Sequence, residues 1–248
     1  MERCRMKAII LCAGYGTRLY PLTKDKPKPL LDVKDKPIAE HIIAKIEEIP
    51  EIDEIFIVTN NKFFKHFLEW NASFTSSKKV TIVNDKTMSN DDRLGSLGDI
   101  KYVIENMNVD EDVMVVAGDN IFEFSIKPMI EIFNEKNKPV VALYDVKDIG
   151  LARLYGIVSV DENKKIIDFE EKPQQPKSTL SSTGIYIYPK ETVKKLIEFT
   201  ETHNSDKAGS FLEWLYKQED IYCYITEEKW FDIGSLEQLE RARKEFSG

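Results

Sequence analysis

Residues 7–23 read KAIILCAGYGTRLYPLT, an apolar run followed at once by a loop with two glycines. Residues 8–11 are apolar and rich in Ile, which predicts a strand buried on both faces. The glycines that follow allow the backbone to bend sharply where the strand ends. This segment therefore predicts a buried strand that ends in a loop with an exposed backbone.

The same kind of apolar run recurs over the first 145 residues. Further strands are expected at residues 55–58, 80–83, 113–117 and 140–143, and residues 37–46, 62–70 and 100–107 have the apolar spacing of helices. Strands that alternate with helices predict βαβ units. We therefore expect an α/β fold with a mixed, mostly parallel sheet flanked by helices.

The second part of the chain has a different pattern. Three strands without intervening helices are expected at residues 156–160, 166–170 and 183–188. The turn at residues 161–163 predicts a hairpin, and hence an antiparallel subregion. Beyond it we expect helices at 191–199 and 210–217 around a polar loop that includes Ser205, a strand at 221–225, and a last helix opened by a Ser235/Gln238 capping box. No linker stands out, so a single domain over residues 1–248 is expected.

Composition excludes several classes of protein. The chain has 248 residues, 42% of them hydrophobic, and a net charge of −8, which argues against a nucleic-acid partner. Cys4, Cys12 and Cys223 are scattered, which argues against a disulfide framework and favours the cytoplasm. The apolar run at residues 8–13 is too short for a signal peptide or a membrane span, so no membrane association is expected.

The glycine loop has the composition of an anion-binding loop. Gly14 and Gly16 let backbone N–H groups approach an anion, and Thr17 and Arg18 add side-chain donors. Two better-known phosphate loops are excluded, because Leu19 stands where the dinucleotide fingerprint needs its third glycine and no Gly-Lys-Ser/Thr is present. Taken alone, the glycines fit a plain strand-to-helix turn equally well.

The next segment favours the anion-binding alternative. Residues 18–36 hold six basic and three acidic side chains within a chain of net charge −8. Pro27 and Pro29 flank Lys28 and are expected to hold it in an extended conformation that presents its ammonium group at one place. The alternative is a solvated charged loop.

These motifs resemble the signature of the sugar-1-phosphate nucleotidyltransferase family, which includes glucose-1-phosphate thymidylyl- and uridylyltransferases and mannose-1-phosphate guanylyltransferases. The pattern is Gly-x-Gly-Thr-Arg-Leu-x-Pro-Leu-Thr followed by Lys-Pro-Lys-Pro-Leu, and further similar motifs cover nearly the whole chain. The resemblance implies a Rossmann-like, GT-A-like fold in which residues 6–145 mainly bind the nucleotide and residues 146–248 mainly bind the sugar phosphate. It also implies transfer of a nucleoside monophosphate from an NTP, with dTTP or UTP favoured, to a sugar 1-phosphate, with glucose 1-phosphate favoured.

Two aspartates are candidates for a metal site. Asp119 follows the strand expected at residues 113–117, at the end where open α/β sheets carry ligands, and Asp232 follows a second short apolar run. Either one alone is equally well explained as a turn or helix-capping aspartate. The resemblance implies that the two jointly hold Mg²⁺, which binds through one or two carboxylates and phosphate oxygens. It also implies that Arg18, Lys28 and Asp119 are catalytic, with Arg18 on the departing pyrophosphate and Lys28 on the α-phosphate.

The same resemblance implies the other contacts with the two substrates. Nucleotide contacts are expected from Leu11, Ala13, Gly14, Gly16, Thr17, Arg18, Asn84 and Gly95. Sugar-phosphate contacts are expected from Gly156, Glu171, Lys172, Thr183 and Gly184. Glu171 would accept hydrogen bonds from sugar hydroxyls and Lys172 would neutralise the phosphate. Residues 85–95 form a longer and more polar link than is usual in the family, so the sequence does not identify the nucleobase.

Two alternatives stay open at this point. One is a cytidylyl- or guanylyltransferase that acts on another sugar or an alcohol phosphate. The other is a non-catalytic regulatory subunit of the same fold. Because the chain ends soon after Asp232 and the last expected helix, we expect no appended C-terminal domain and a monomer or homodimer.

Overall fold

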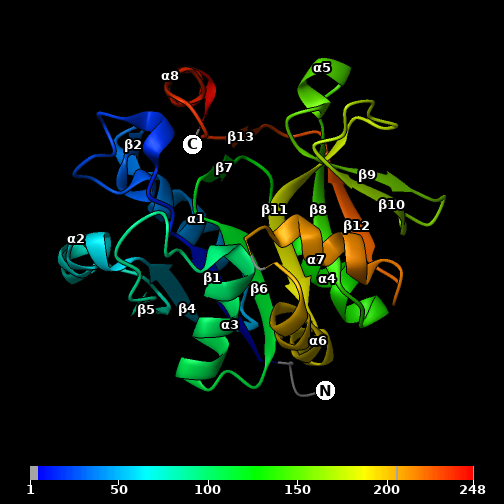
Figure 1. Cartoon of the computed structure of the whole chain (residues 1–248), viewed down its shortest axis with the longest axis horizontal. Helices are drawn as coiled ribbons and strands as arrows, with labels where there is room; N and C mark the ends of the chain where they lie inside the picture. The colour runs from blue at the N-terminus through cyan, green and yellow to red at the C-terminus, as the bar shows by residue number, and fades with distance from the viewer. Residues whose placement is uncertain (1–4, 205, 248) are drawn as a thin grey trace.

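Strands and helices alternate along most of the chain in the computed structural model, which describes residues 5–204 and 206–247 (Figure 1). The strands are β1 (Met6–Leu11), β2 (Asp32–Val33), β3 (Lys36–Pro37), β4 (Ile52–Thr59), β5 (Lys79–Asn84), β6 (Asp112–Ala117), β7 (Asn120–Phe122), β8 (Val140–Asp145), β9 (Gly156–Val160), β10 (Ile166–Glu171), β11 (Leu180–Tyr188), β12 (Tyr222–Thr226) and β13 (Trp230–Asp232). The helices are α1 (Ile38–Glu47), α2 (Asn61–Ser73), α3 (Gly95–Met107), α4 (Lys127–Lys136), α5 (Ile149–Ala152), α6 (Lys190–Thr202), α7 (Ala208–Leu215) and α8 (Leu236–Glu245), with 3₁₀ turns η1 (Thr17–Leu19) and η2 (Lys28–Leu30).

A nine-stranded sheet forms the centre of the molecule. Strands β6, β1, β4 and β5 are neighbours in that order and pair in parallel, whereas β11 runs antiparallel to β6, β8 and β9. The register places Leu11 of β1 beside Ala117 of β6, so the carboxyl ends of these two strands lie at one edge. The expected mixed, mostly parallel sheet and its antiparallel subregion, including the β9–β10 hairpin, are confirmed.

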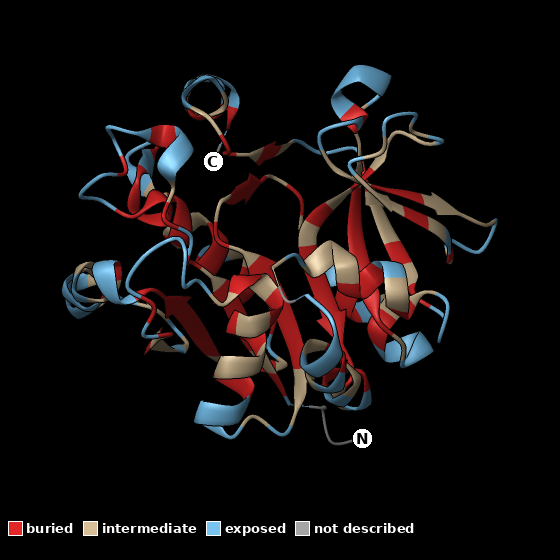
Figure 2. Cartoon of the chain, in the orientation of Figure 1, coloured by how far each residue is buried: buried red, intermediate tan, exposed pale blue. Residues whose placement is uncertain are grey.

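Helices cover both faces of this sheet, which explains why its strands are continuous apolar runs. Successive residues of β1 point to opposite sides: Ala8 and Ile10 pack in the cluster with α1, α2, α4 and α8, and Ile9 packs in the cluster with α3, α6 and α7. Figure 2 shows the same arrangement, with buried strands between helices whose outer faces are exposed. A core in two layers therefore holds the strand ends rigidly in place.

A small second sheet, β7 paired with β13, was not expected from the sequence. Each strand has only three residues, and their antiparallel register places Asp232 beside Asn120. Strands this short carry little local signal, because their stability comes from the partner strand. The sequence pattern also missed β2, β3, α4 and α5.

The last helix begins as its sequence predicts, with one difference in the cap. The Gln238 N–H donates to Ser235 Oγ over 3.3 Å. The Gln238 side chain, however, accepts from the N–H of Gly234 over 2.9 Å rather than from that of Ser235, so the reciprocal bond of a capping box is displaced by one residue.

Two of the three cysteines lie in the part of the chain that the structure describes. Cys12 and Cys223 are buried free thiols, while Cys4 lies outside the described residues, as does Ser205 of the expected polar loop. Within residues 5–204 and 206–247, no helix has both the length and the apolar character needed to cross a membrane.

Candidate active site

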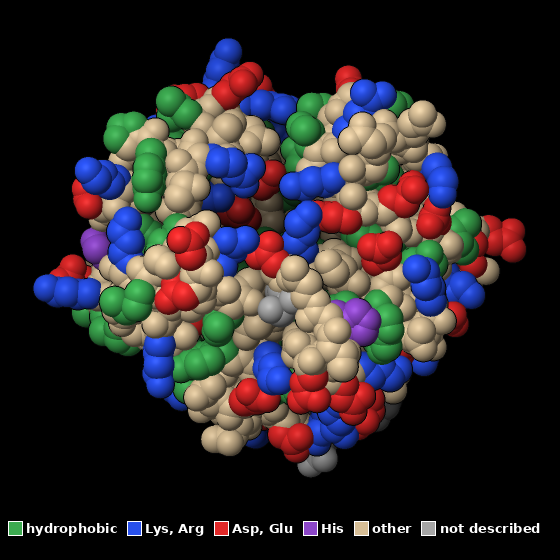
Figure 3. Space-filling view, viewed as in Figure 1, with side chains coloured by type: hydrophobic (Ala, Val, Ile, Leu, Met, Phe, Trp, Pro, Cys, Tyr) green, Lys and Arg blue, Asp and Glu red, His purple; other side chains and the backbone are tan. Residues whose placement is uncertain are grey.

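Two adjoining cavities open at the edge where β1 and β6 end. The first, here called the loop cavity, has a volume of about 330 Å³ and is lined by the glycine loop, Lys28 and Asp119. The second, here called the ribbon cavity, has a volume of about 450 Å³ and is lined by residues of β9, β10 and β11 together with Trp230 and Asp232. Both cavities are lined by Leu11, Arg18, Ser96, Ala117 and Asp206. Figure 3 shows Lys, Arg, Asp and Glu side chains gathered around the hollow.

The glycine loop is shaped by Gly16 rather than by both glycines. Gly16 has φ 63°, in the left-handed region, and its carbonyl accepts a 2.6 Å hydrogen bond from the Thr23 hydroxyl. A Cβ at Gly16 would lie 3.1 Å from the Thr23 Cβ. Gly14 is not among the positive-φ glycines, and a Cβ there would meet nothing within 4 Å. Gly14 thus leaves the loop backbone uncovered towards the cavity, while Gly16 makes the turn.

The end of β6 requires glycine at position 118. The Gly118 N–H donates to the Leu11 carbonyl over 3.0 Å. A Cβ at this position would lie 2.5 Å from the Cys12 sulfur and 2.6 Å from that carbonyl oxygen. The close approach of the two chain segments fixes the next residue, Asp119, at the edge of the loop cavity.

Lys28 and Asp119 form an ion pair at this edge, with 2.8 Å between Lys28 Nζ and Asp119 Oδ2. Lys28 is buried, 9% exposed, and begins the 3₁₀ turn η2, so the extended conformation expected for it between two prolines is wrong. Pro27, which precedes the turn, is extended, and Pro29 lies within the turn. Burial opposes ionisation of Asp119, but Lys28 and then Arg18 more than offset it and lower the pKa of Asp119. Asp119 is therefore anionic at neutral pH.

The second aspartate lies beside the first. The Ile233 N–H donates to the Asp119 carbonyl over 3.0 Å, and the β7–β13 pairing holds Asp232 against Asn120. Burial, followed by the negative charge of Asp119, raises the pKa of Asp232 to about 6. Two carboxylates held together in this way are favourably placed to receive a cation.

The donor atoms at this position fit Mg²⁺. Asp119 and Asp232 supply carboxylate oxygens, and Asn120 Oδ1 is buried without a hydrogen-bond partner in the described part of the chain. No group of three or more His, Cys, Asp or Glu side chains that could enclose a metal ion occurs among the described residues. Mg²⁺ prefers oxygen ligands and is commonly held by one or two carboxylates together with substrate phosphates, so this smaller set is sufficient.

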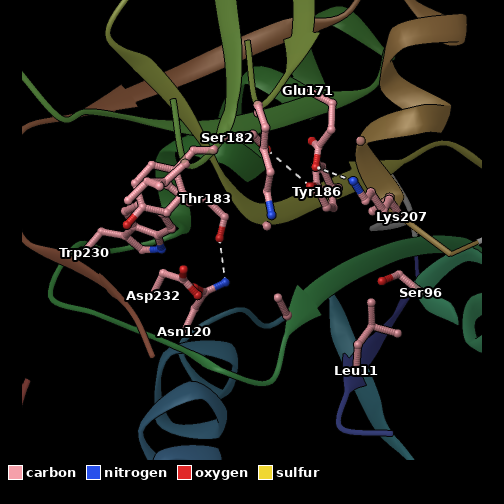
Figure 4. Close-up of a pocket in the computed structure, with 18 of the residues that line it drawn as sticks. Leu11, Ser96, Asn120, Glu171, Ser182, Thr183, Tyr186, Lys207, Trp230 and Asp232 are labelled. Carbon is pink, nitrogen blue, oxygen red and sulfur yellow. Dashed lines mark hydrogen bonds and ion pairs between the residues drawn. The ribbon is translucent and has the colours of Figure 1, made fainter. Parts of the chain in front are cut away.

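The ribbon cavity carries the residues expected for the sugar phosphate. Lys172 has φ 50°, a left-handed conformation that is uncommon for lysine, and its N–H donates to the Tyr155 carbonyl over 3.0 Å. Lys172 and Asp232 both line this cavity, and the charge of Lys172 opposes the rise in the pKa of Asp232. Figure 4 shows Glu171 beside Lys207, at 3.6 Å, and the amide of Asn120 donating to the Thr183 carbonyl over 2.7 Å.

Nearly all the residues expected from the sequence line these cavities. The loop cavity contains Leu11, Ala13, Gly14, Gly16, Thr17, Arg18, Lys28, Gly95 and Asp119. The ribbon cavity contains Gly156, Glu171, Lys172, Thr183, Gly184 and Asp232, again with Leu11 and Arg18. Asn84 is the exception, because it lines neither cavity: its amide donates to Asn61 over 2.8 Å and its carbonyl accepts from the N–H of Lys86.

Several lining residues were not found from the sequence. In the loop cavity they include Tyr15, Asn90, Arg93 and Asp99, and in the ribbon cavity Arg153, Lys207 and Trp230. The one usable signal was Asp99, a carboxylate between Leu97 and Ile100 near the start of a helix. An acidic residue among apolar neighbours at a strand-to-helix edge is a candidate for a buried functional group.

Comparison with known proteins agrees with this geometry. The sequence profile of the nucleotidyl transferase family matches residues 7–247. The chain is 31% identical over 244 residues to a bifunctional protein GlmU of Methanocaldococcus jannaschii, covering 96% of this chain and 54% of that protein. It is 30% identical to a glucose-1-phosphate adenylyltransferase of Clostridium novyi, covering 98% of this chain and 67% of that one. The chain thus spans about half the length of the GlmU relative.

Solved structures resemble the whole chain. A structure from Bacillus anthracis in complex with sucrose, provisionally described as a glucose-1-phosphate thymidylyltransferase, superposes with a TM-score of 0.82 at 27% identity, covering 96% of this chain and 94% of that one. A UDP-glucose pyrophosphorylase complexed with UDP-glucose superposes with a TM-score of 0.81 at 23% identity, covering 97% of both chains, and supports the fold.

Proposed function

The chain belongs to the nucleotidyl transferase family, and we propose that it transfers a nucleoside monophosphate from an NTP to a sugar 1-phosphate and releases pyrophosphate. The observation that carries this proposal is the Lys28–Asp119 ion pair, 2.8 Å between Nζ and Oδ2, in a cavity that adjoins the one holding Lys172. A cation for each of two phosphates beside a pair of carboxylates is the arrangement that phosphoryl transfer needs.

The loop cavity is assigned to the NTP. Backbone N–H groups around Gly14 and Gly16 can approach the phosphates, and Arg18, which lines both cavities, is placed to bind the pyrophosphate that leaves. Lys28 is assigned to the α-phosphate, because it is buried and its charge is held in one position. A positioned cation stabilises charge that develops on the transferring group.

The ribbon cavity is assigned to the sugar 1-phosphate. Lys172 orients its phosphate towards the α-phosphorus, and Glu171, Thr183 and the backbones of Gly156 and Gly184 contact the sugar. The phosphate oxygen then attacks the α-phosphorus in line. No general base is needed, because a phosphate monoester is already anionic near neutral pH. The protein's contribution is to position the two phosphates and to offset their mutual repulsion.

Asp119 and Asp232 are the residues that would hold Mg²⁺, which when bound would neutralise charge on the phosphate oxygens. Glucose 1-phosphate is favoured as the acceptor, and dTTP or UTP as the donor. The provisional description of the B. anthracis structure as a glucose-1-phosphate thymidylyltransferase agrees with this choice. We place the reaction in the cytoplasm, carried out by a monomer or homodimer.

The proposal is tested by measuring pyrophosphate release from ATP, GTP, CTP, UTP and dTTP in pairwise combination with glucose 1-phosphate, mannose 1-phosphate and phosphocholine. We expect turnover with a sugar 1-phosphate and an NDP-sugar among the products. Turnover only with phosphocholine would establish the alcohol-phosphate alternative. No turnover with any pair by a folded, nucleotide-binding protein would point to the non-catalytic alternative.

A further inference from the structure

A second polar group lines the loop cavity besides Lys28 and Asp119. It consists of Tyr15 in the glycine loop, Asp85 and Thr87 after β5, and Asp99 in α3, all of them buried. Strand order β6-β1-β4-β5 separates β5 from β6 by three strand spacings, about 14 Å. Tyr15 and Asp99 line the cavity. Asp85 and Thr87 therefore lie on the β5 side of the sheet, and Asp99 and Tyr15 carry the group to the wall of the cavity.

The hydrogen bonds of this group have a fixed direction. The backbone N–H of Thr87 donates to Asp85 Oδ1 over 2.7 Å, and the Thr87 hydroxyl donates to the same oxygen over 2.9 Å. Because a hydroxyl has one hydrogen, the Tyr15 hydroxyl, 3.1 Å from Thr87 Oγ1, is the donor in that contact. Burial raises the pKa of Asp85, but the two donors from Thr87 favour its ionised form.

Asp99 holds the opposite protonation state. Its carboxyl group makes a hydrogen-bonded contact with that of Asp85, and two carboxyl groups can share such a bond only if one carries a proton. Asp85 has two donors from Thr87, so the proton belongs to Asp99. Burial, followed by the negative charge of Asp85, raises the pKa of Asp99 to about 8.

The acceptor capacity of Asp99 is not used within the protein. Asp99 is 6% exposed, and its Oδ1 is buried without a hydrogen-bond donor from any residue that the structure describes. The proton of the carboxylic acid is used in the contact with Asp85, which leaves oxygen lone pairs on a group that lines the cavity. A buried acceptor without a donor is costly, and a ligand that supplies the donor recovers that free energy.

We propose that Asp99, which is buried in the wall of the loop cavity, accepts a hydrogen bond from an N–H group of the nucleobase and thereby sets the base preference of the enzyme. This inference rests on the proposed function. Ionised phosphates and base carbonyls have no hydrogen to donate to such an acceptor. Each nucleobase does carry N–H groups, and their positions differ from one base to another. A base that places a carbonyl oxygen or a ring nitrogen acceptor at Asp99 brings two buried acceptors together without a hydrogen between them. Such a base is expected to bind more weakly.

The experiment measures equilibrium binding of ATP, GTP, CTP, UTP and dTTP by calorimetry, in the presence of Mg²⁺. It compares the wild type with Asp99→Ala, Asp99→Asn and the control Asp91→Asn, an exposed carboxylate in the same link. We expect Asp99→Ala to reduce the ratio between the tightest and the weakest nucleotide by about tenfold or more. Asp99→Asn keeps a donor towards Asp85 and an acceptor towards the base, so it should keep the wild-type order, as should Asp91→Asn.

An unchanged ratio in Asp99→Ala would overturn the inference, and so would an equal loss for all five nucleotides, which would indicate a contact with the ribose. Absence of nucleotide binding by the wild type would also overturn it. If Asp99→Ala does not fold, Asp99→Ser provides the same comparison with a polar group retained. Base discrimination that depends on Asp99 without pyrophosphate release would leave this inference standing and contradict only the proposed function.

Discussion

Charge at the site is arranged by single residues whose partners come from distant parts of the chain. Lys28 pairs with Asp119, Asp119 raises the pKa of Asp232, and Lys172 acts on Asp232 within the ribbon cavity. Lys28 and Lys172 therefore each lie near a carboxylate, besides the phosphate that we propose each of them binds. This balance keeps buried charges tolerable before substrates bind.

Removal of Lys172 tests the division between the two cavities. Lys172→Ala should raise the KM for the sugar 1-phosphate about tenfold or more, with a smaller effect on the KM for the NTP, because its ammonium group lines only the ribbon cavity. Initial rates with each substrate varied in turn provide the measurement. Lys177→Ala is the matched control, since Lys177 pairs with Asp168 at the surface. A loss confined to the NTP would contradict the assignment.

The shared proton of Asp85 and Asp99 predicts a dependence of stability on pH. Folding raises the pKa of Asp99 to about 8 from an ordinary value of 3.8. The stabilisation of the folded state by protonated Asp99 is therefore complete below about pH 4 and is lost as the pH rises to 8. The titratable groups that face the pair are Tyr15, Cys12 and Asp92. Asp99→Asn should remove this part of the loss, which thermal unfolding between pH 5 and pH 9 can measure. Parallel wild-type and variant curves would contradict the shared proton.

At the residue scale, the sequence predicts those site residues that belong to local motifs. Three of them, Gly16, Arg18 and Lys28, lie within a short segment after β1, so the sequence alone shows that they belong together. Asn84 was expected to contact the nucleotide, but its side chain donates a hydrogen bond to Asn61 and accepts one from the N–H of Lys86. Asp99 lines the loop cavity and contacts Asp85. That contact depends on how α3 packs against the end of β5, which no local sequence pattern specifies.

At the scale of elements, short strands decide where the second carboxylate lies. The sequence predicted most of the long strands and helices, because their apolar periodicity is local, but it missed the helix α4. It did not predict β7 and β13, and it could not place Asp232 beside Asp119 without the family resemblance, because the β7–β13 pairing joins residues far apart in the chain. Elements of three residues are specified by their partner rather than by their own sequence.

A substitution at Gly118 tests whether the close packing at the end of β6 fixes the position of Asp119. Gly118→Ala should lower the free energy of unfolding by about 1–3 kcal/mol and also reduce turnover, because its Cβ would overlap the Leu11 carbonyl and displace Asp119. Denaturant unfolding measures the first effect and pyrophosphate release the second. Gly14→Ala is the control for stability, since a Cβ there meets nothing within 4 Å. Equal stability of the two variants would contradict the steric account.

At the scale of the whole molecule, one sheet passes through both parts of the chain. Strand β8 from the first part pairs with β11 and β12 from the second, and β11 pairs with β6. We propose on this basis that residues 1–248 form a single domain. The sequence indicated this only indirectly, through the absence of a linker.

A single domain predicts one cooperative unfolding transition. Trp70 lies in the first part of the chain and Trp214 and Trp230 in the second, so tryptophan fluorescence reports on both. Fluorescence and far-ultraviolet circular dichroism should give the same midpoint in a urea titration. Two separated transitions would instead indicate that residues 6–145 and 146–248 unfold independently.

The central claim is that phosphates from the two cavities meet at Asp119 and Lys28. Pyrophosphate release at saturating glucose 1-phosphate and the preferred NTP, compared between the wild type, Asp119→Asn and Asp53→Asn, tests it most directly. Asp53 pairs with Lys7 near the other end of the sheet, so its variant should keep wild-type turnover. We predict a loss of turnover of at least about a hundredfold for Asp119→Asn, assayed well below its thermal unfolding midpoint so that the variant is folded. Turnover by folded Asp119→Asn at the rate of Asp53→Asn would contradict the account.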